Sequence, residues 1–131
     1  MNRLLRHFAR WGRDRSGAAA VEYAFVLPVF AMLLIGVINM SQLMGALSGM
    51  HFAVEEAARC SAVNATLCPN PSSTVAFAAS RYDGPDVGPQ FQATQQGCGH
   101  SVTATAQFEL DVAVAVFDVP ISAAACYPAV A

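Results

Sequence analysis

The stretch YAFVLPVFAMLLIGVINMSQLM, residues Tyr23 to Met44, decides the fold of this chain. It contains no Asp, Glu, Lys or Arg, and the next charged residue is Glu55. A helix of about 20 predominantly apolar residues spans the hydrocarbon core of a bilayer. The stretch therefore predicts a transmembrane helix, and the hydrophobic content of 55% for the whole chain agrees with a protein that places part of its surface in lipid.

The segments on the two sides of this helix differ in charge. Residues 1–17 contain five arginines and one acidic residue, Asp14, whereas the rest of the chain contains two arginines and eight acidic residues. Positive residues stay on the cytoplasmic side of a membrane helix, so residues 1–17 are expected to be a basic cytoplasmic leader. The chain would then cross a bacterial inner membrane once and continue in the periplasm. Its acidic remainder offers no basic surface, which excludes nucleic acid as a partner.

The helix is expected to extend well beyond the membrane, over residues 18–63. Glu55-Glu56-Ala57-Ala58-Arg59 combines good helix formers with a polar face, which is typical of a solvated helix. Pro28 lies in the first third of this helix, where its ring removes one backbone hydrogen bond and clashes with the preceding turn. A kink or local unwinding is therefore predicted near Pro28.

Residues 64–131 are predicted to fold as a small periplasmic domain. The segment Pro69-Asn70-Pro71-Ser72-Ser73 is typical of a loop that ends in a helix N-cap, so a short amphipathic helix is expected from Thr74 to Tyr82. The Gly- and Pro-rich segment 83–89 is then expected to be a turn-rich linker.

From Phe91 onward apolar and polar residues alternate, which indicates antiparallel strands. The alternation is clearest from Val102 to Leu110, and a Val-rich stretch follows from Val112 to Val119. Pro120 cannot donate a backbone hydrogen bond, so it predicts an edge strand or a bulge before the last stretch, Ile121–Tyr127. The expected fold class is α+β, with a long N-terminal transmembrane helix, a short helix and a small antiparallel sheet of three or four strands.

Four cysteines, Cys60, Cys68, Cys98 and Cys126, all follow the apolar stretch. An even number of cysteines in an exported segment indicates two disulfides, for which three pairings exist. Proximity in the sequence favours Cys60–Cys68, which would hold the helix end to the following loop. The second disulfide would then be Cys98–Cys126, between the first and last strands of the sheet.

Side chains that support catalysis or metal binding form no recognisable pattern in this sequence. A zinc site built from Cys98, His100 and Cys126 would need a fourth ligand, and the spacing of these residues matches no common zinc motif. His51 is expected to be an interfacial side chain near the membrane exit. Because no Ser-His-Asp, paired-carboxylate or phosphate-loop pattern is present, we expect neither enzymatic activity nor a metal or cofactor.

The segment where the leader meets the helix, Ser16-Gly17-Ala18-Ala19-Ala20-Val21-Glu22-Tyr23, combines a small residue and a carboxylate. Glu22 is a single acidic residue at the edge of an otherwise neutral membrane helix, where such a residue usually has a partner. Cleavage after Gly17 would give Ala18 a free α-amino group. In a bundle of such helices, Glu22 of one subunit would neutralise the amine of a neighbour and so set the axial register.

At these residues the chain resembles type IV prepilins, whose leaders are cut after a glycine and whose mature chains have glutamate as the fifth residue. The Glu22-Tyr23 pair and the stretch from Gly17 to Pro28, with Glu55-Glu56-Ala57-Ala58-Arg59 downstream, are similar to the TadE-type minor pseudopilins of tight-adherence (Flp) pilus systems. The major Flp pilin of these systems resembles a bare short helix, whereas this chain continues into a folded domain.

The resemblance implies a subunit that is built into a thin pilus or primes its assembly. Prepilin peptidase would process the chain between Gly17 and Ala18, and Glu22 and Tyr23 would take part in assembly and register. The implied partners are other minor pseudopilins, the major Flp pilin and the pilus assembly platform.

Two other interpretations of the N-terminal half remain open. If the chain is not cut, it is a single-pass membrane protein whose periplasmic domain binds a partner in the envelope. If Ala46-Leu47-Ser48 is a signal-peptidase site, a secreted enzyme or adhesin begins near Gly49. The apolar stretch is, however, longer than the about 7–15 residues of a typical signal-peptide core.

Gly45 and Gly49 form a GxxxG pattern, which lets two membrane helices approach closely. The pattern lies at the outer end of the apolar stretch. Small residues where the helix leaves the membrane are an equally good explanation.

Overall fold

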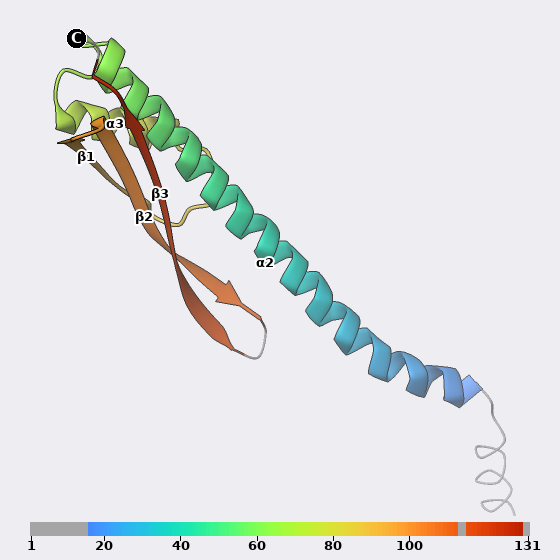
Figure 1. Ribbon diagram of the computed structural model, residues 1–131. Helices are drawn as coiled ribbons and strands as arrows, with labels where there is room; N and C mark the ends of the chain where they lie inside the picture. The colour runs from blue at the N-terminus through green and yellow to red at the C-terminus, as the bar shows by residue number, and fades with distance from the viewer. Residues whose placement is uncertain (1–15, 113–114, 130–131) are drawn as a thin grey trace, which may run out of the picture. The chain divides into compact units, whose positions relative to one another are not determined.

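The computed structural model describes residues 16–112 and 115–129 of the chain. Its elements, in chain order, are helix α2 (Ser16–Val63), helix α3 (Pro71–Arg81) and strands β1 (Gln90–Gln96), β2 (Gly99–Asp111) and β3 (Val116–Tyr127) (Figure 1). They form two compact units that divide between Gly36 and Val37, within α2. The α+β class expected from the sequence is confirmed. Residues 1–15 of the expected leader lie outside the described residues.

Helix α2 begins at Ser16, slightly before the expected start at Ala18, and ends at Val63 as expected. It continues through Pro28 without a break in helical structure, so no local unwinding accompanies the proline. The helix axis changes direction in the N-terminal, blue part of the ribbon (Figure 1), which agrees with the predicted kink. One missing backbone hydrogen bond bends a helix but leaves the turns on both sides intact.

Helix α3 begins about one turn earlier than expected, at Pro71 instead of Thr74. Asn70 is its N-cap: the Asn70 side-chain oxygen accepts a 2.9 Å hydrogen bond from the backbone N–H of Ser73, and the Ser73 hydroxyl accepts one of 3.2 Å from the backbone N–H of Asn70. This reciprocal pair is a capping box, and proline suits the first helical position because its missing N–H is not needed there. The expected start was therefore wrong: Pro71 belongs to the first turn and not to the loop.

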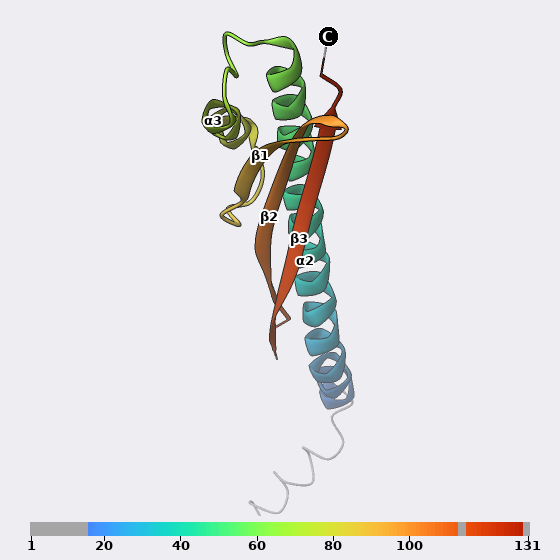
Figure 2. The ribbon, with the colours of Figure 1, turned by 60° about the vertical axis from the view of Figure 1, so that its left-hand side comes forward.

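The sheet has the strand order β1-β2-β3, and both strand pairs are antiparallel. Strand β3 lies at an edge and runs continuously through Pro120, which is opposite Gln107 of β2. The edge position predicted for Pro120 is confirmed, because an edge strand tolerates a residue that cannot donate a backbone hydrogen bond. The stretches before and after Pro120 form one strand, so the sheet has three strands. Strands β2 and β3 run side by side (Figure 2).

The hydrophobic core lies between one face of the sheet and the C-terminal half of α2. Alternate residues of β2 from Val102 to Phe108 are buried, whereas Thr105 and Gln107 between them are exposed. Ala46, Met50 and Val54 lie four residues apart, so they share one face of α2, and they are fully buried. The buried cluster comprises Ala46, Met50, Val54, Ala57, Ala58, Ala78, Val102, Ala104, Ala106, Phe108, Ile121 and Ala123.

Two disulfides join Cys60 to Cys68 and Cys98 to Cys126, which is the pairing favoured from the sequence. The first holds the end of α2 to the loop that follows. The second joins the connection between β1 and β2 to the end of β3, since Cys98 immediately precedes Gly99. Both bonds therefore stabilise the same end of the C-terminal unit.

Replacing Cys98 and Cys126 together with serine is expected to destabilise the C-terminal unit. The two cysteines are 28 residues apart and exposed, so their replacement leaves no cavity and acts mainly through the unfolded chain. The chain-entropy model gives a loss of about 3.6 kcal/mol for a loop of this length. Urea unfolding in detergent measures the loss, with Ser122→Ala as a control on an exposed position of the same strand. An unchanged midpoint would contradict the prediction.

The GxxxG pattern on α2 is covered by the chain's own linker. A Cβ atom added at Gly49 would lie 3.0 Å from the backbone oxygen of Asp83 and 3.1 Å from Cε2 of Tyr82. A Cβ atom at Gly45 would lie 3.6 Å from Cδ of Pro85, which is an ordinary contact. Glycine at position 49 therefore has a structural reason within the C-terminal unit, the close approach of the linker.

The variants Gly45→Ala and Gly49→Ala are expected to differ in stability. Alanine in a helix interior stabilises by about 0.5–1 kcal/mol relative to glycine, and Gly45→Ala should show this gain. At Gly49 the added methyl group presses on the linker, and overpacking costs about 1–3 kcal/mol. Gly49→Ala should thus be the less stable of the two by about this cost. Equal denaturation midpoints for the two variants would mean that the linker yields freely.

Tyr82 holds the linker to the core. Its hydroxyl donates a 2.6 Å hydrogen bond to the backbone oxygen of Pro85, and its ring centroid lies 6.5 Å from that of Phe91. Burial of the side chain, with a further contribution from the Asp86 carboxylate, raises the pKa of Tyr82 above its ordinary value of 10.0. Deprotonation of Tyr82 is therefore unfavourable in the folded state.

The stability of the C-terminal unit is accordingly expected to decrease above about pH 10. A raised folded-state pKa means that the contribution of Tyr82 is complete below the unfolded pKa and is lost as the pH rises through the folded one. Thermal unfolding across this range, compared with Tyr82→Phe, isolates the effect. Few other side chains titrate in this pH range, because the chain has no lysine and all four cysteines are in disulfides. The same alkaline decrease in both proteins would assign it to other groups.

Candidate functional site

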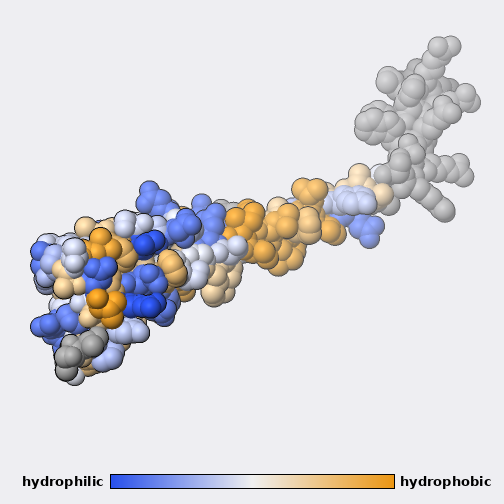
Figure 3. Space-filling model, turned by 90° about the horizontal axis from the view of Figure 1, so that it is seen from above, coloured by the Kyte–Doolittle hydropathy of each residue, from blue (hydrophilic) through white to orange (hydrophobic). Residues whose placement is uncertain are grey.

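The apolar stretch from Tyr23 to Met44 is exposed along most of its length, with Ile35, Asn39 and Leu43 half-buried. Tyr23 is 71% exposed, Phe25 75% and Leu33 64%. The most apolar window of α2 has no residue buried inside the protein, whereas a core helix of a soluble protein would be buried. Figure 3 shows the stretch as hydrophobic surface, in orange, along α2. Among the described residues, α2 is the one helix long and apolar enough to cross a membrane, which is compatible with a single-pass membrane protein.

The residues predicted for cleavage and register lie together at the N-terminal end of this stretch. Gly17 is exposed, and a Cβ atom added there would meet nothing within 4 Å, so the fold itself does not require glycine. Glu22 and Tyr23 are exposed as well. Ala18 and Glu22 are four residues apart in α2, which is about one helical turn. An α-amino group on Ala18 would therefore lie within one turn of the Glu22 carboxylate.

A comparison with protein families identifies this part of the chain. The family model described as TadE-like protein matches residues 17–59. Over this part of its length the chain is similar to TadE-like proteins. The match begins at Gly17, includes Glu22 and Tyr23, and ends at Arg59, so the resemblance inferred from the sequence is confirmed. No curated protein and no solved structure matches the chain.

The TadE-like segment links the chain to tight-adherence pilus systems at the level of the family. It covers residues 17–59 of 131 and leaves α3, the sheet and both disulfides outside. It contains the exposed apolar stretch, but also Ala46, Met50 and Val54, which supply the helical side of the core. The segment therefore joins two functions in one helix: an apolar surface that needs an environment outside the chain, and a face that organises the sheet.

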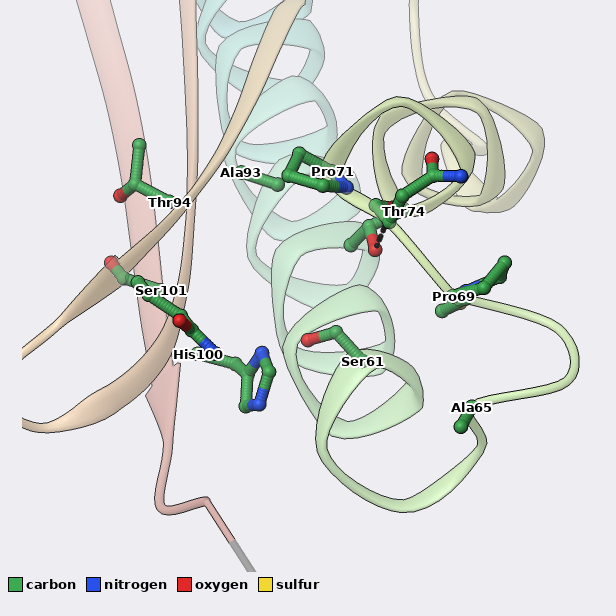
Figure 4. Close-up of a pocket in the computed structure, with 12 residues that line it drawn as sticks. Ser61, Ala65, Pro69, Pro71, Thr74, Ala93, Thr94, His100 and Ser101 are labelled. Carbon is green, nitrogen blue, oxygen red and sulfur yellow. Dashed lines mark hydrogen bonds between the residues drawn. The ribbon is translucent and has the colours of Figure 1, made fainter.

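A groove that sequence reasoning missed lies where the end of α2, the start of α3, and strands β1 and β2 meet (Figure 4). Its volume is about 400 Å³. The buried Thr74 hydroxyl donates a 3.0 Å hydrogen bond to the backbone oxygen of Asn70, and no buried side-chain N or O atom in the described part of the chain lacks a partner. The groove is lined by Ser61, Ala65, Cys68, Pro69, Asn70, Pro71, Thr74, Ala93, Thr94, Gln95, His100 and Ser101.

Neither the groove nor its surroundings present the elements of a metal site. Cys98 and Cys126 are bonded to each other, so neither offers a thiolate, and the zinc alternative loses both of its sulfur ligands. Across residues 16–112 and 115–129, no group of three or more His, Cys, Asp and Glu side chains is placed to hold a metal ion. His100, which lies in the groove, is half-buried and is opposite Tyr127 in the sheet register.

Proposed function

We propose that this chain is a minor pseudopilin for the assembly or priming of a tight-adherence (Flp) pilus. The TadE-like match that begins at Gly17 supports this role most strongly. In the proposal, prepilin peptidase cuts between Gly17 and Ala18, and Tyr23–Met44 hold the mature protein in the bacterial inner membrane. The C-terminal unit lies in the periplasm. The protein acts by assembly and has no catalytic step of its own.

The exposed apolar stretch supports an assembly role because such a surface needs an apolar environment at every stage. Lipid provides this environment before assembly, and neighbouring helices provide it in the filament. Glu22 lies at the edge of this surface, one turn after Ala18. Once the leader is removed, the Ala18 amine of a neighbouring subunit supplies the counter-charge for Glu22. A desolvated pair of this kind selects one axial register, because any shift leaves both charges unpaired.

The C-terminal unit gives the proposed subunit a folded head. Its core is built from α2 and the sheet, and two disulfides hold it. A bare helix can repeat along a thin filament, whereas a head of this kind suits the cap or the initiating complex. The proposed partners are therefore other minor pseudopilins, the major Flp pilin and the assembly platform, in addition to prepilin peptidase.

Mass spectrometry of the native N-terminus tests the proposal directly. A mature chain that begins at Ala18 is the expected result, and it should be absent from cells that lack prepilin peptidase. An intact Met1 in wild-type cells would favour an uncleaved single-pass membrane protein. A soluble product that begins near Gly49 would favour signal-peptidase cleavage. Either of these two results would overturn the pseudopilin proposal.

A further inference from the structure

The tip of the β2–β3 hairpin carries large apolar side chains that the core does not cover. Val116 is 57% exposed and Phe117 54%, whereas Ile121 and Ala123 farther along the same strand are 6% and 4% exposed. A folded head that lay entirely in water would not gain from extending β3 with such residues. A nonpolar environment beside the tip would remove this apolar area from water.

This hairpin tip is attached to α2 within the apolar stretch. The Asn39 side-chain amide donates a 2.8 Å hydrogen bond to the backbone oxygen of Asp111, which joins residues 72 apart in the sequence. Both ribbon views show β2 and β3 beside the part of α2 that belongs to the same compact unit (Figures 1 and 2). Asp111 is opposite Val116, so the exposed end of β3 is at the level of Asn39.

The neighbouring residues of α2 at this level are apolar and exposed as well. Val37 is 68% exposed, Ile38 57% and Met40 52%. Met44, where the apolar stretch ends, is five residues beyond Asn39, or about 7.5 Å along a helix that rises 1.5 Å per residue. If the stretch up to Met44 lies in a bilayer, the hairpin tip lies at the same depth as the outer part of that stretch. The polar interfacial layer on each side of a bilayer is itself several ångströms thick.

Charged residues limit how deep the hairpin can enter. Glu109 and Asp118 are opposite each other on β2 and β3, directly above the pair Leu110 and Phe117, and both are exposed. Carboxylates avoid the hydrocarbon core, so the hairpin can enter lipid only at its tip. Asp111, opposite Val116, is a further exposed carboxylate at the tip itself, so Val116 and Phe117 can reach only the boundary between acyl chains and headgroups.

We propose that the β2–β3 hairpin tip, through Val116 and Phe117, inserts into the outer-leaflet interface of the membrane beside α2. The proposal rests on the membrane location of α2 within the proposed function, but not on cleavage or pilus assembly. Lipid is the occupant because it must surround Val37, Ile38 and Met40 at the same level of the helix. The head is then held to the membrane surface at two points, the helix and the hairpin.

Quenching of tryptophan fluorescence by lipid tests this insertion in the full chain. The native Trp11 is replaced with phenylalanine, and Phe117→Trp is reconstituted in phosphatidylcholine vesicles with and without brominated acyl chains. Ala124→Trp is the matched control, since Ala124 is exposed on the same strand away from the tip. We expect blue-shifted emission at position 117 and quenching by brominated lipid that is several-fold stronger than at position 124. If Phe117→Trp misfolds, as loss of its disulfides would show, Val116→Trp is used in its place. The same blue shift and the same stronger quenching are then expected at position 116.

Equal quenching at positions 117 and 124, while vesicle flotation shows that the protein is inserted, would overturn the proposal. Blue-shifted emission that brominated lipid does not quench would assign the tip to a protein partner and would also overturn it. Vesicles with few copies of the chain keep a second copy from covering the tip. An intact Met1 in cells would overturn the pseudopilin proposal but leave these signals of the full chain unchanged. A product that begins near Gly49 would instead remove the membrane helix and Asn39, on which the insertion of the tip depends.

Discussion

Replacing Gly17 with valine is expected to leave the basic leader on the chain and to abolish incorporation into the pilus. The structure places nothing within 4 Å of a Cβ atom at Gly17, so the folded chain accepts a larger residue there. A requirement for glycine would then come from the active site of the peptidase, which must accommodate the residue before the cleaved bond. Without cleavage, Ala18 has no α-amino group to pair with Glu22. The N-terminal mass and the fraction of protein in sheared pili measure the two effects.

Gly36→Val is the matched control for this experiment. Gly36 is also in α2 with nothing within 4 Å of an added Cβ atom, and it is far from the cleavage site. This variant should be shortened normally. If Gly17→Val were shortened by the same 17 residues as the wild type, the proposed cleavage site would be wrong.

Replacing Glu22 with glutamine is expected to allow cleavage but to reduce assembly into the pilus by about tenfold or more, which corresponds to about 1.4 kcal/mol per factor of ten. Glutamine keeps the size of the side chain and removes only its charge. The amine of Ala18 then enters an apolar bundle without a counter-charge, and unpaired charges in a membrane cost up to several kcal/mol. Immunoblots of the sheared pilus fraction and of the membrane fraction give the ratio.

Glu55→Gln is the control, since Glu55 is an exposed carboxylate on the same helix beyond the apolar stretch. It should assemble as well as the wild type, and Glu22→Asp should recover part of the lost assembly because it restores the charge. Normal assembly of Glu22→Gln would remove the proposed register role of Glu22. An equal loss with Glu55→Gln would point to net charge instead of position.

Features that depend on local pattern could be predicted from the sequence. The apolar run from Tyr23 to Met44 identified the helix, and the alternation from Val102 to Leu110 identified the central strand. Pro120 predicted an edge strand or a bulge, and the structure has the edge strand. The family resemblance also depended on a contiguous motif around Gly17 and Glu22. Such features are encoded by neighbouring residues, which are available in a single sequence.

Apart from the Cys98–Cys126 disulfide, which remained once Cys60 was paired with its neighbour Cys68, features that depend on residues far apart could not be predicted. The linker over Gly49, the hydrogen bond from Asn39 to Asp111 and the groove near His100 each combine segments from different elements. The GxxxG pattern has two physical uses, a second helix or a close segment of backbone, and only the packed structure distinguishes them. The predicted start of α3 was wrong for a simpler reason: a proline such as Pro71 suits both a loop and the first turn of a helix.

The way the core combines α2 with the sheet also imposes an order on folding. Cys60 and Cys68 are only eight residues apart and can meet as soon as α2 has formed, whereas the bond between Asn39 and Asp111 closes a separation of 72 residues. Distant closures are slow because their loop entropy is lost before the contacts form. Until the sheet arrives, the face of α2 with Ala46, Met50 and Val54 is a bare apolar surface on a newly made chain. Chaperones, proteases and other copies of the chain can therefore bind this uncovered face of α2 until the C-terminal unit has folded.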